Sequence, residues 1–553
     1  MLNTFKQAPF YLDEQAIKWV KDTYKNFTTE QKIGQLFNLM VMQNSPDELA
    51  MIKKIQPGAI TKFVTGSLET EINTINKIRH LSNTPLLISS DLEGGSMSFS
   101  FGAQVPNQLA LAGLNDKKAV DYCTNVIAQE AKLLGINWSF TPVIDINKKF
   151  KSAIVGTRSY GSDIHLIKSM SQANIKILQQ NNIAATVKHW PGEGFDDRDQ
   201  HLVTTVNPMT KDQWDQSFGK LYQSAINNDV KAVMSAHIAL PQYTKLYEDN
   251  QEQWWRPASI NKHLNQTLLR DELGFNGLVV SDASTMAGVS SFSNRETVCV
   301  ETIENGCDML LFCQDPLQDF DFLLNGLRNG QLSEARLEQS VLRILAMKAS
   351  LNLHHPSQDL SVDAFKQLTQ SDYAKNIKKI NRSTPHLVKN KSDFLPITVE
   401  SKKRVLIISE GIKNIFSPHP IPLQVNEMLI KKGFEVVEFK AGISLQPENY
   451  DWILYLFSNE SGLLKSRIYI DWLSLHAGFM ESMYRPWVDL PTVMVSFGHP
   501  YLLYDAPSVP VYINAYCPNS DVQQAVVDAL VGEINFNDQA AIDPFCGLDQ
   551  LKY

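Results

Sequence analysis

Residues 188–201 bring together the side-chain types that acid–base chemistry needs. The segment KHWPGEGFDDRDQH contains two histidines, one lysine, one arginine, one glutamate and three aspartates. It follows the β-branched and alanine-rich run 183–187 and is interrupted by proline and glycine, so we expect a strand that ends in a polar loop. Asp199 and His201 are two residues apart in this loop, and a carboxylate hydrogen-bonded to an imidazole lets the ring donate and then accept a proton. The alternative interpretation is a solvated surface loop that this hydrogen bond merely stabilises.

Asp282 is the second candidate for chemistry, because it closes the apolar run 277–281. A carboxylate that neighbouring donors hold at such a position stays ionised and can attack an electrophilic carbon. One fixed nucleophilic carboxylate and one mobile acid/base are together the equipment of retaining glycoside cleavage, although the second group there is usually a carboxylic acid.

Eight short apolar runs, separated by helix-length segments, are predicted to be the strands that position these residues. Each run is apolar throughout, as in parallel strands that helices cover on both faces. Eight β-then-α units predict a (β/α)₈, TIM-like barrel, whereas a doubly wound sheet is the competing topology. The runs are 34–41, 59–64, 86–90, 138–144, 184–188, 232–236, 278–281 and 309–312.

Ionisable residues recur where these strands end. A barrel core tolerates no charge midway along a strand, but the carboxyl-terminal rim of the barrel collects such side chains in one cavity. One such residue could be a helix cap or a structural histidine, but several together favour an active site. The residues in question are Asp91, Asp145, Lys188, His189, His237 and Asp282.

A second, smaller unit is predicted after the barrel. We assign residues 1–355 to the barrel domain, 356–401 to a linker with one helix, and 402–553 to a smaller α/β sandwich domain. The second domain begins with the apolar strand 405–408 and ends with a helix near 522–531. It contains no GxGxxG or Walker loop, so nothing in it indicates nucleotide binding.

The composition excludes several classes of partner. A net charge of −8 over 553 residues, without a basic cluster, argues against nucleic acid and anionic membranes. The polar N-terminus is unlike a secretory peptide, and no apolar run is long enough to span a bilayer. The six cysteines are scattered without a CxxC pair, which is typical of the cytoplasm and of neither a disulfide framework nor a zinc site. We therefore expect a cytoplasmic protein with no metal and no membrane partner.

The order of motifs resembles glycoside hydrolase family three, in its β-N-acetylhexosaminidase branch. Residues 188–194 followed by 199–201 resemble the KHFPGHG…DSH motif of that branch, and similar blocks extend over nearly the whole chain. These blocks lie at 33–37, 91–95, 140–145, 158–161, 236–237, 273–282, 306–310 and, in the second domain, 495–503.

The resemblance implies a role for each matching residue. Asp282 would be the nucleophile, His201 the acid/base and Asp199 its partner, while hydroxyl groups of the sugar in the −1 pocket would be held by Asp91, Arg158, Lys188 and His189. It also implies hydrolysis of terminal β-linked N-acetylglucosamine from cell-wall or chitin-type oligosaccharides by double displacement, without a metal or cofactor. The family's β-glucosidases instead use a carboxylate acid/base, often from the second domain, so the loop dyad favours N-acetylglucosaminides.

Two positions depart from the family pattern. After Gly95 the family usually continues with arginines, spaced as Arg-x-x-x-Arg, whereas residues 96–99 are SMSF. A bidentate arginine clamp on sugar hydroxyls is therefore missing or comes from elsewhere. Glu193 stands where the motif more often has histidine, and we interpret it as a simple loop acid, with a second proton donor as the alternative.

Three other functions remain open at the level of sequence. A histidine acid/base repels phosphate less than a carboxylate does, so a β-glycoside phosphorylase is compatible with the dyad. A β-glucosidase of the same family is the second alternative, and an inactive carbohydrate-binding homologue that lost its arginines is the third.

Overall fold

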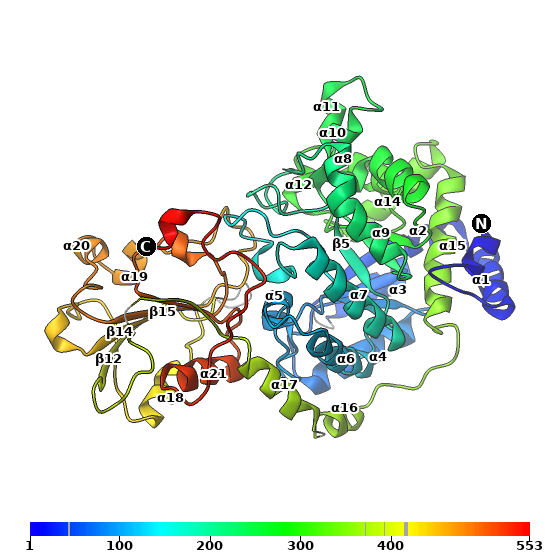
Figure 1. Cartoon of the computed structure of the whole chain (residues 1–553). Coiled ribbons are helices and arrows are strands. Elements are labelled where there is room, and N and C mark those ends of the chain that lie inside the picture. Colours follow the sequence, from blue (N-terminus) through cyan, green and yellow to red (C-terminus); the bar gives the residue numbers. More distant parts are fainter. Residues whose placement is uncertain (43–44, 371, 392, 414–418) are drawn as a thin grey trace.

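The structure, a computed structural model, describes residues 1–42, 45–370, 372–391, 393–413 and 419–553. It has two lobes, each built around parallel strands (Figure 1). No helix among these described residues is both long and apolar enough to cross a membrane.

The first lobe contains two larger parallel sheets with helices outside them, besides a small parallel pair of β6 (Thr205–Val206) and β8 (Ile238–Ala239). One sheet has the order β10-β1-β2-β3-β4 and the other the order β5-β7-β9. Its strands are β1 (Phe37–Val41), β2 (Ala59–Lys62), β3 (Leu87–Ser90), β4 (Trp138–Ser139), β5 (Thr186–Trp190), β7 (Ala232–Ser235), β9 (Leu278–Ser281) and β10 (Leu310–Leu311).

Isolated parallel bridges connect the edges of these two sheets. Trp138 of β4 pairs with Ala184, just before β5, and Val280 of β9 pairs with Met309, just before β10. Both edges of the five-stranded sheet therefore lie beside edges of the three-stranded sheet. Each of the eight runs predicted as strands contains a strand, although the first starts later than predicted because residues 34–35 belong to α2.

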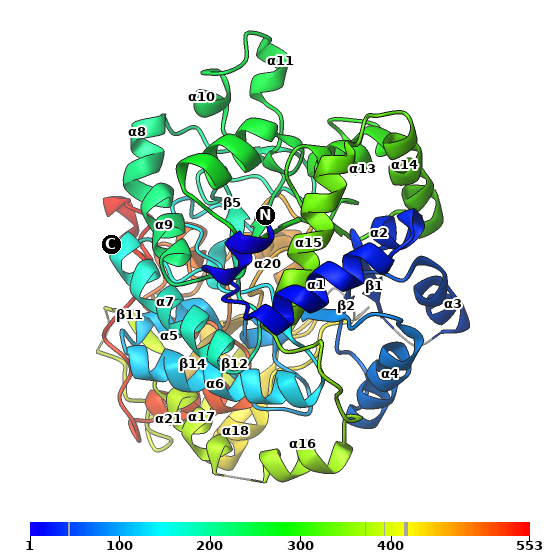
Figure 2. The same ribbon diagram turned by 90° about the vertical axis from the view of Figure 1, so that its right-hand side faces the viewer.

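The helices of the first lobe begin at polar side chains that cap them. Thr28 and Gln31 form a capping box at α2, and Ser45 and Glu48 form another at α3. Figure 2 shows α1 packed across α15. The main helices are α1 (Glu14–Asn26), α2 (Thr29–Gln35), α3 (Pro46–Ile55), α4 (Leu68–Leu81), α5 (Gln108–Gly113), α6 (Lys117–Leu133), α7 (Ile164–Gln180), α9 (Lys220–Ile226), α13 (Arg295–Glu304), α14 (Pro316–Arg328) and α15 (Glu334–Ser350).

The second lobe is a sheet of six strands with helices on both faces. Its order is β11-β16-β15-β14-β12-β13, and all neighbours are parallel except β11 and β16. The strands are β11 (His386–Asn390), β12 (Arg404–Ser409), β13 (Glu435–Glu438), β14 (Trp452–Phe457), β15 (Thr492–Ser496) and β16 (Val511–Asn514).

Alternate residues of the central strands pack into different layers. On β12, Val405 and Ile407 face α18 (Val425–Lys431) and α21 (Ser520–Leu530), whereas Leu406 and Ile408 face the cluster that contains Leu502 and Trp487. This two-residue period is what a strand buried on both faces requires.

The predicted linker 356–401 is more structured than expected. It contains two helices, α16 (Val362–Thr369) and α17 (Tyr373–Arg382), where one was predicted, and it contributes β11 as an edge strand of the second sheet. α17 contacts both α6 and α21, so it lies between the two lobes (Figure 1).

Candidate active site

The predicted sugar-binding residues form one network of ion pairs. The Lys188 Nζ atom lies 2.7 Å from Asp91 Oδ1 and 2.7 Å from Glu93 Oε1. Arg158 donates from Nε and Nη2 to the two carboxylate oxygens of Glu93, each at 2.9 Å. The Nη2 atom of Arg158 also lies 3.5 Å from His189 Nε2. The structure therefore brings together all four residues that the sequence assigned to sugar binding.

Glu93 is the centre of this network, and sequence reasoning gave it no role. It is buried, and burial raises its pKa, but the charges of Arg158 and Lys188 outweigh burial and hold that pKa far below its usual range. Asp91 and Glu93 in turn raise the pKa of Lys188 against the effect of burial. Glu93, Arg158 and Lys188 therefore stay charged, and charged groups make strong hydrogen bonds to hydroxyl groups.

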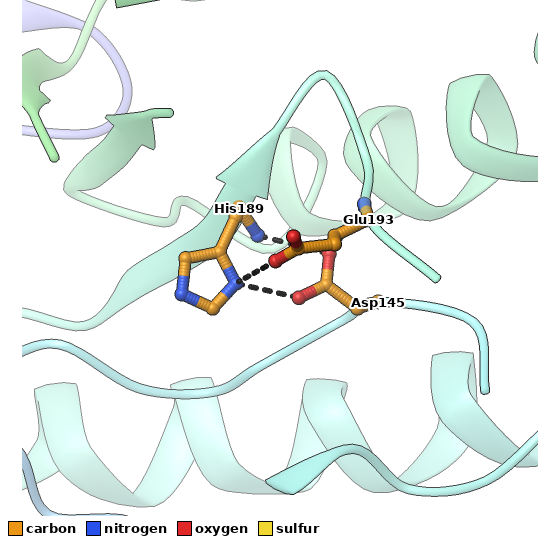
Figure 3. A group of neighbouring side chains, drawn as sticks. All are labelled: Asp145, His189 and Glu193. Atoms are coloured by element: carbon orange, nitrogen blue, oxygen red, sulfur yellow. Dashed lines mark hydrogen bonds and ion pairs between the residues drawn. The ribbon is translucent and has the colours of Figure 1, made fainter. Parts of the chain in front are cut away.

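His189 is oriented by Asp145, which follows β4 (Figure 3). The distance from His189 Nδ1 to Asp145 Oδ2 is 2.6 Å, and Asp145 Oδ1 accepts from the backbone N–H groups of His189 and Glu193. Nδ1 therefore carries the proton, which leaves Nε2 on the side of Arg158.

Glu193 is a buried acid surrounded by other carboxylates. Its Oε2 atom accepts from Gln200 and lies 3.9 Å from His189 Nδ1, while Oε1 has no hydrogen-bond partner among the described residues. Burial and the charges of Asp145 and Asp199 raise the pKa of Glu193 well above its ordinary value. The buried site therefore favours the protonated form of Glu193 over the carboxylate.

Asp145, His189 and Glu193 have ligand atoms within 4.8 Å of one another, the spacing of a metal site. A metal ion there would have to displace the proton between His189 and Asp145. The donor set is thus already used in a hydrogen bond that orients the imidazole.

Asp282 directly follows β9. Its Oδ1 accepts from the Ala283 N–H at 2.7 Å. Burial raises the pKa of Asp282, but the nearby rings of His189, His237 and His201 and the Ala283 N–H lower it overall. The carboxylate stays ionised, as a nucleophile must.

His237 supports the turn after Asp282. Its Nε2 donates to the carbonyl of Ala283 at 2.9 Å and its Nδ1 lies 2.8 Å from Ser259 Oγ. Burial lowers the pKa of His237, so the ring is neutral with both nitrogens engaged. This strand-end histidine therefore fixes the segment whose N–H holds Asp282.

The Asp199–His201 dyad lies on the loop after β5. Asp199 Oδ1 is 2.7 Å from His201 Nδ1 and 2.9 Å from its backbone nitrogen. The Asp199 side chain is only 1% exposed, whereas that of His201 is 26% exposed. The loop is attached to the chain that follows Asp282, because Ala287 N–H donates to the carbonyl of His201. Nδ1 is held by Asp199, so Nε2 is the nitrogen available for proton transfer.

A loop of the second lobe reaches this site, which sequence reasoning did not anticipate. Leu464 N–H donates to Asp199 Oδ2 at 3.1 Å. In the same loop, Glu460 accepts from Ser96 N and from Asn107 Nδ2, each at 2.7 Å. We call residues 459–464 the bridging loop. No local sequence signal marks it, since its partners lie more than 260 residues away along the chain.

Sequence comparisons relate the chain to known glycoside hydrolases. Residues 28–347 match the family model described as "Glycosyl hydrolase family 3 N terminal domain". The chain is 35% identical over 558 residues to a "Beta-N-acetylglucosaminidase/beta-glucosidase" of Cellulomonas fimi, covering 98% of each chain. It is 33% identical to a "Beta-hexosaminidase" of Pasteurella multocida, over 44% of this chain and 68% of that relative.

Among solved structures, a "Beta-glucoside phosphorylase BglX bound to 2FGlc" superposes with a TM-score of 0.92 at 29% identity. The likeness covers 99% of this chain and 100% of that one. Both lobes are therefore shared with that phosphorylase.

Proposed function

Since the chain belongs to glycosyl hydrolase family 3, we propose that it is a retaining enzyme that removes terminal β-linked N-acetylglucosamine from short oligosaccharides. The observation that carries the proposal is the Asp199–His201 dyad, whose imidazole is partly exposed, on a loop attached to the segment that follows Asp282. Cell-wall fragments and chitin-type oligosaccharides are the substrate class.

The proposed mechanism is double displacement. The Asp282 carboxylate attacks the anomeric carbon while His201 gives its Nε2 proton to the departing glycosidic oxygen. Water then attacks the resulting glycosyl ester, His201 takes the proton of that water, and Asp282 leaves as a carboxylate. Asp199 stabilises the charged imidazole through the 2.7 Å contact to Nδ1.

The remaining predicted residues would hold the sugar. Lys188 and Arg158 would donate to its hydroxyl groups, Asp91 would accept from them, and His189 would present Nε2. The support is their joint position in one ion-pair network with Glu93.

Two observations favour the histidine over a carboxylate as acid/base. The imidazole of His201 is partly exposed, whereas Glu460, the carboxylate that the bridging loop contributes, has both oxygens engaged with Ser96 and Asn107.

The double name of the Cellulomonas fimi relative supports β-glucosides as a second substrate class.

Phosphorolysis is the second candidate reaction. It is favoured by the full-length likeness to the β-glucoside phosphorylase. A neutral imidazole also admits an anionic acceptor more readily than a second carboxylate would. In that reaction phosphate replaces water in the second step and the product is a sugar 1-phosphate.

We also propose that the eight strands of the first lobe close into a (β/α)₈ barrel. The isolated bridges at both sheet edges support this closure. Residues 1–355 would form the catalytic domain and 402–553 the α/β domain, with β11 of the 356–401 segment completing the second sheet.

The test combines a substrate panel with trapping of the intermediate. Aryl β-N-acetylglucosaminide, β-glucoside and β-xyloside would be assayed with and without phosphate, and the products identified as free sugar or sugar 1-phosphate. We expect the N-acetylglucosaminide to be cleaved fastest, and a 2-fluoro glycoside to label the peptide that contains Asp282. No cleavage of any β-glycoside, or a label on another residue, would refute the proposal.

A further inference from the structure

We propose that Glu460, contributed by the second lobe, is a positioning residue for the sugar-binding network, in place of the arginines absent from residues 96–99. The inference rests on the proposed function, because it concerns the same sugar pocket. It assigns to the second lobe a part in substrate recognition.

The turn that follows Glu93 needs support from outside. Gly94 and Gly95 have φ values of +75° and +57°, a left-handed conformation that favours glycine. The three-residue 3₁₀ helix Gly95–Met97 follows, and the SMSF segment supplies no charged side chain of its own. One outside contact comes from the same lobe, since Gly95 N–H donates to the Val105 carbonyl at 2.7 Å.

Glu460 supplies that support at close range. It is 8% exposed, and its two oxygens accept from the Ser96 N–H and the Asn107 amide, each at 2.7 Å. A β-carbon on Gly95 would lie 2.3 Å from Glu460 Oε1, so Glu460 could not keep this position if residue 95 carried a side chain. Asn107 Nδ2 also donates to the Tyr516 carbonyl of the second lobe. Hydrogen bonds that involve a carboxylate are among the stronger ones in proteins.

The backbone of the bridging loop contacts the segment that precedes Arg158. The carbonyl of Glu460 accepts from Thr157 Oγ1 at 2.9 Å, and Thr157 precedes Arg158. Gly462 N–H donates to the Ala153 carbonyl at 2.7 Å. Glu460 thus touches both turns whose side chains form the bidentate Glu93–Arg158 pair.

The bridging loop is itself firmly attached to the second sheet. His499 N–H donates to the Asn459 carbonyl, and a β-carbon on Gly498 would lie 2.1 Å from that same oxygen. The loop can therefore hold the turns of Glu93 and Arg158 in fixed positions relative to each other. Misplacement of a substrate-positioning group by about 1 Å can cost about 100-fold in rate.

Three variants test the proposal. Glu460→Ala removes both side-chain contacts. Glu460→Gln keeps one acceptor oxygen, but its side-chain NH₂ group then faces one of the two donors, Ser96 N–H or the Asn107 amide. Asn537→Ala is the matched control, since Asn537 Nδ2 also bonds across the lobes, to the Gly113 carbonyl at 3.0 Å.

We expect Glu460→Ala to lower kcat/KM by about 10- to 100-fold, mainly through KM, with Glu460→Gln in between and Asn537→Ala unchanged. Deoxy sugars should reveal the cause. Arg158→Ala should make kcat/KM insensitive to the removal of the one sugar hydroxyl that Arg158 binds. Glu460→Ala should make kcat/KM insensitive to the removal of that same hydroxyl. Thermal unfolding should be the same in Glu460→Ala and Asn537→Ala.

Amide hydrogen exchange gives a readout that needs no turnover. Exchange in residues 94–99 and 156–159 should accelerate at least about tenfold in Glu460→Ala and not in Asn537→Ala. Unchanged exchange, or kinetics equal to those of the control, would overturn the inference. If Glu460→Ala does not fold, Glu460→Gln decides by the same measurements. Accelerated exchange in a protein that cleaves no β-glycoside would refute the proposed function while leaving Glu460 as the residue that holds the two turns in position.

Discussion

Asp199→Asn is the substitution that most directly tests the dyad. Asp199 Oδ1 accepts from two groups of His201 and Oδ2 accepts from Leu464 N–H. Asparagine has one oxygen for these three donors. If the asparagine oxygen faces His201, the side-chain NH₂ group faces Leu464 N–H, and two donors then lie opposite each other. If the amide faces His201 instead, the ring must change its tautomer.

The magnitude follows from the role of the proton. General acid–base catalysis contributes about 10²- to 10⁴-fold, which corresponds to roughly 3–5 kcal/mol of transition-state stabilisation. We expect a loss of that order in kcat/KM when the leaving group is a sugar. An activated aryl leaving group needs little protonation, so the loss there should be at least about tenfold smaller.

The assay compares Asp199→Asn with Asp196→Asn on both classes of substrate. Asp196 lies in the same loop and accepts from Arg198 and from Val206 N–H, but not from the imidazole. The control should therefore change kcat/KM by less than about threefold. Equal losses on both leaving groups, or equal losses in the two variants, would show that Asp199 only stabilises its loop.

Burial raises the pKa of Glu130 from 4.5 to about 6, so the folded state binds the proton more tightly than the unfolded state does. The free energy of unfolding should therefore fall by about 2 kcal/mol as the pH rises from about 4.5 to above 6. Glu130→Gln, which keeps an acceptor for the Tyr373 hydroxyl, should abolish this fall in urea titrations, and a wild-type slope in the variant would contradict the assignment. Glu193→Gln should keep kcat/KM within about threefold across neutral pH, because burial and the neighbouring carboxylates favour the protonated form of Glu193 and glutamine keeps an acceptor for Gln200; a collapse in the pH–rate profile would mean that Glu193 ionises during turnover. Leu464 has φ +63° and is 63% exposed, so Leu464→Gly should retain activity and gain up to about 1 kcal/mol in thermal unfolding experiments, whereas lost activity would show that its side chain binds substrate.

The strands that could be predicted are those buried on both faces. A parallel strand covered by helices leaves a continuous apolar run, and every such run in the first lobe holds a strand. Edge strands leave no such record. Residues 435–438 are EVVE, largely accessible, and 386–390 are HLVKN, so neither β13 nor β11 was predicted.

The sequence also indicated which residues end the strands, but not what each of them contacts. Asp199 and His201 are two residues apart, so their pairing is local and could be predicted. Glu93 and Arg158 are 65 residues apart, and Glu460 is more than 350 residues from Ser96. Contacts between loops of different elements depend on the packing of whole lobes, which no local spacing encodes.

Asp282 and Asp308 show why placing a carboxylate does not define its task. Both lie beside strands of the first lobe and both are buried, but Asp308 is surrounded by Arg270, Arg336 and Arg343, with contacts of 2.7–3.3 Å, which lower its pKa to about 2 against burial. A carboxylate neutralised by three guanidinium groups stabilises the fold and has no remaining affinity for an electrophile. Within the described part of the chain, Asp282 meets imidazoles and one backbone N–H rather than a lysine or arginine. Asp282 is therefore ionised, and no cationic side chain of lysine or arginine pairs with it among the described residues. This difference in partners distinguishes Asp282, the candidate nucleophile, from Asp308, the structural acid.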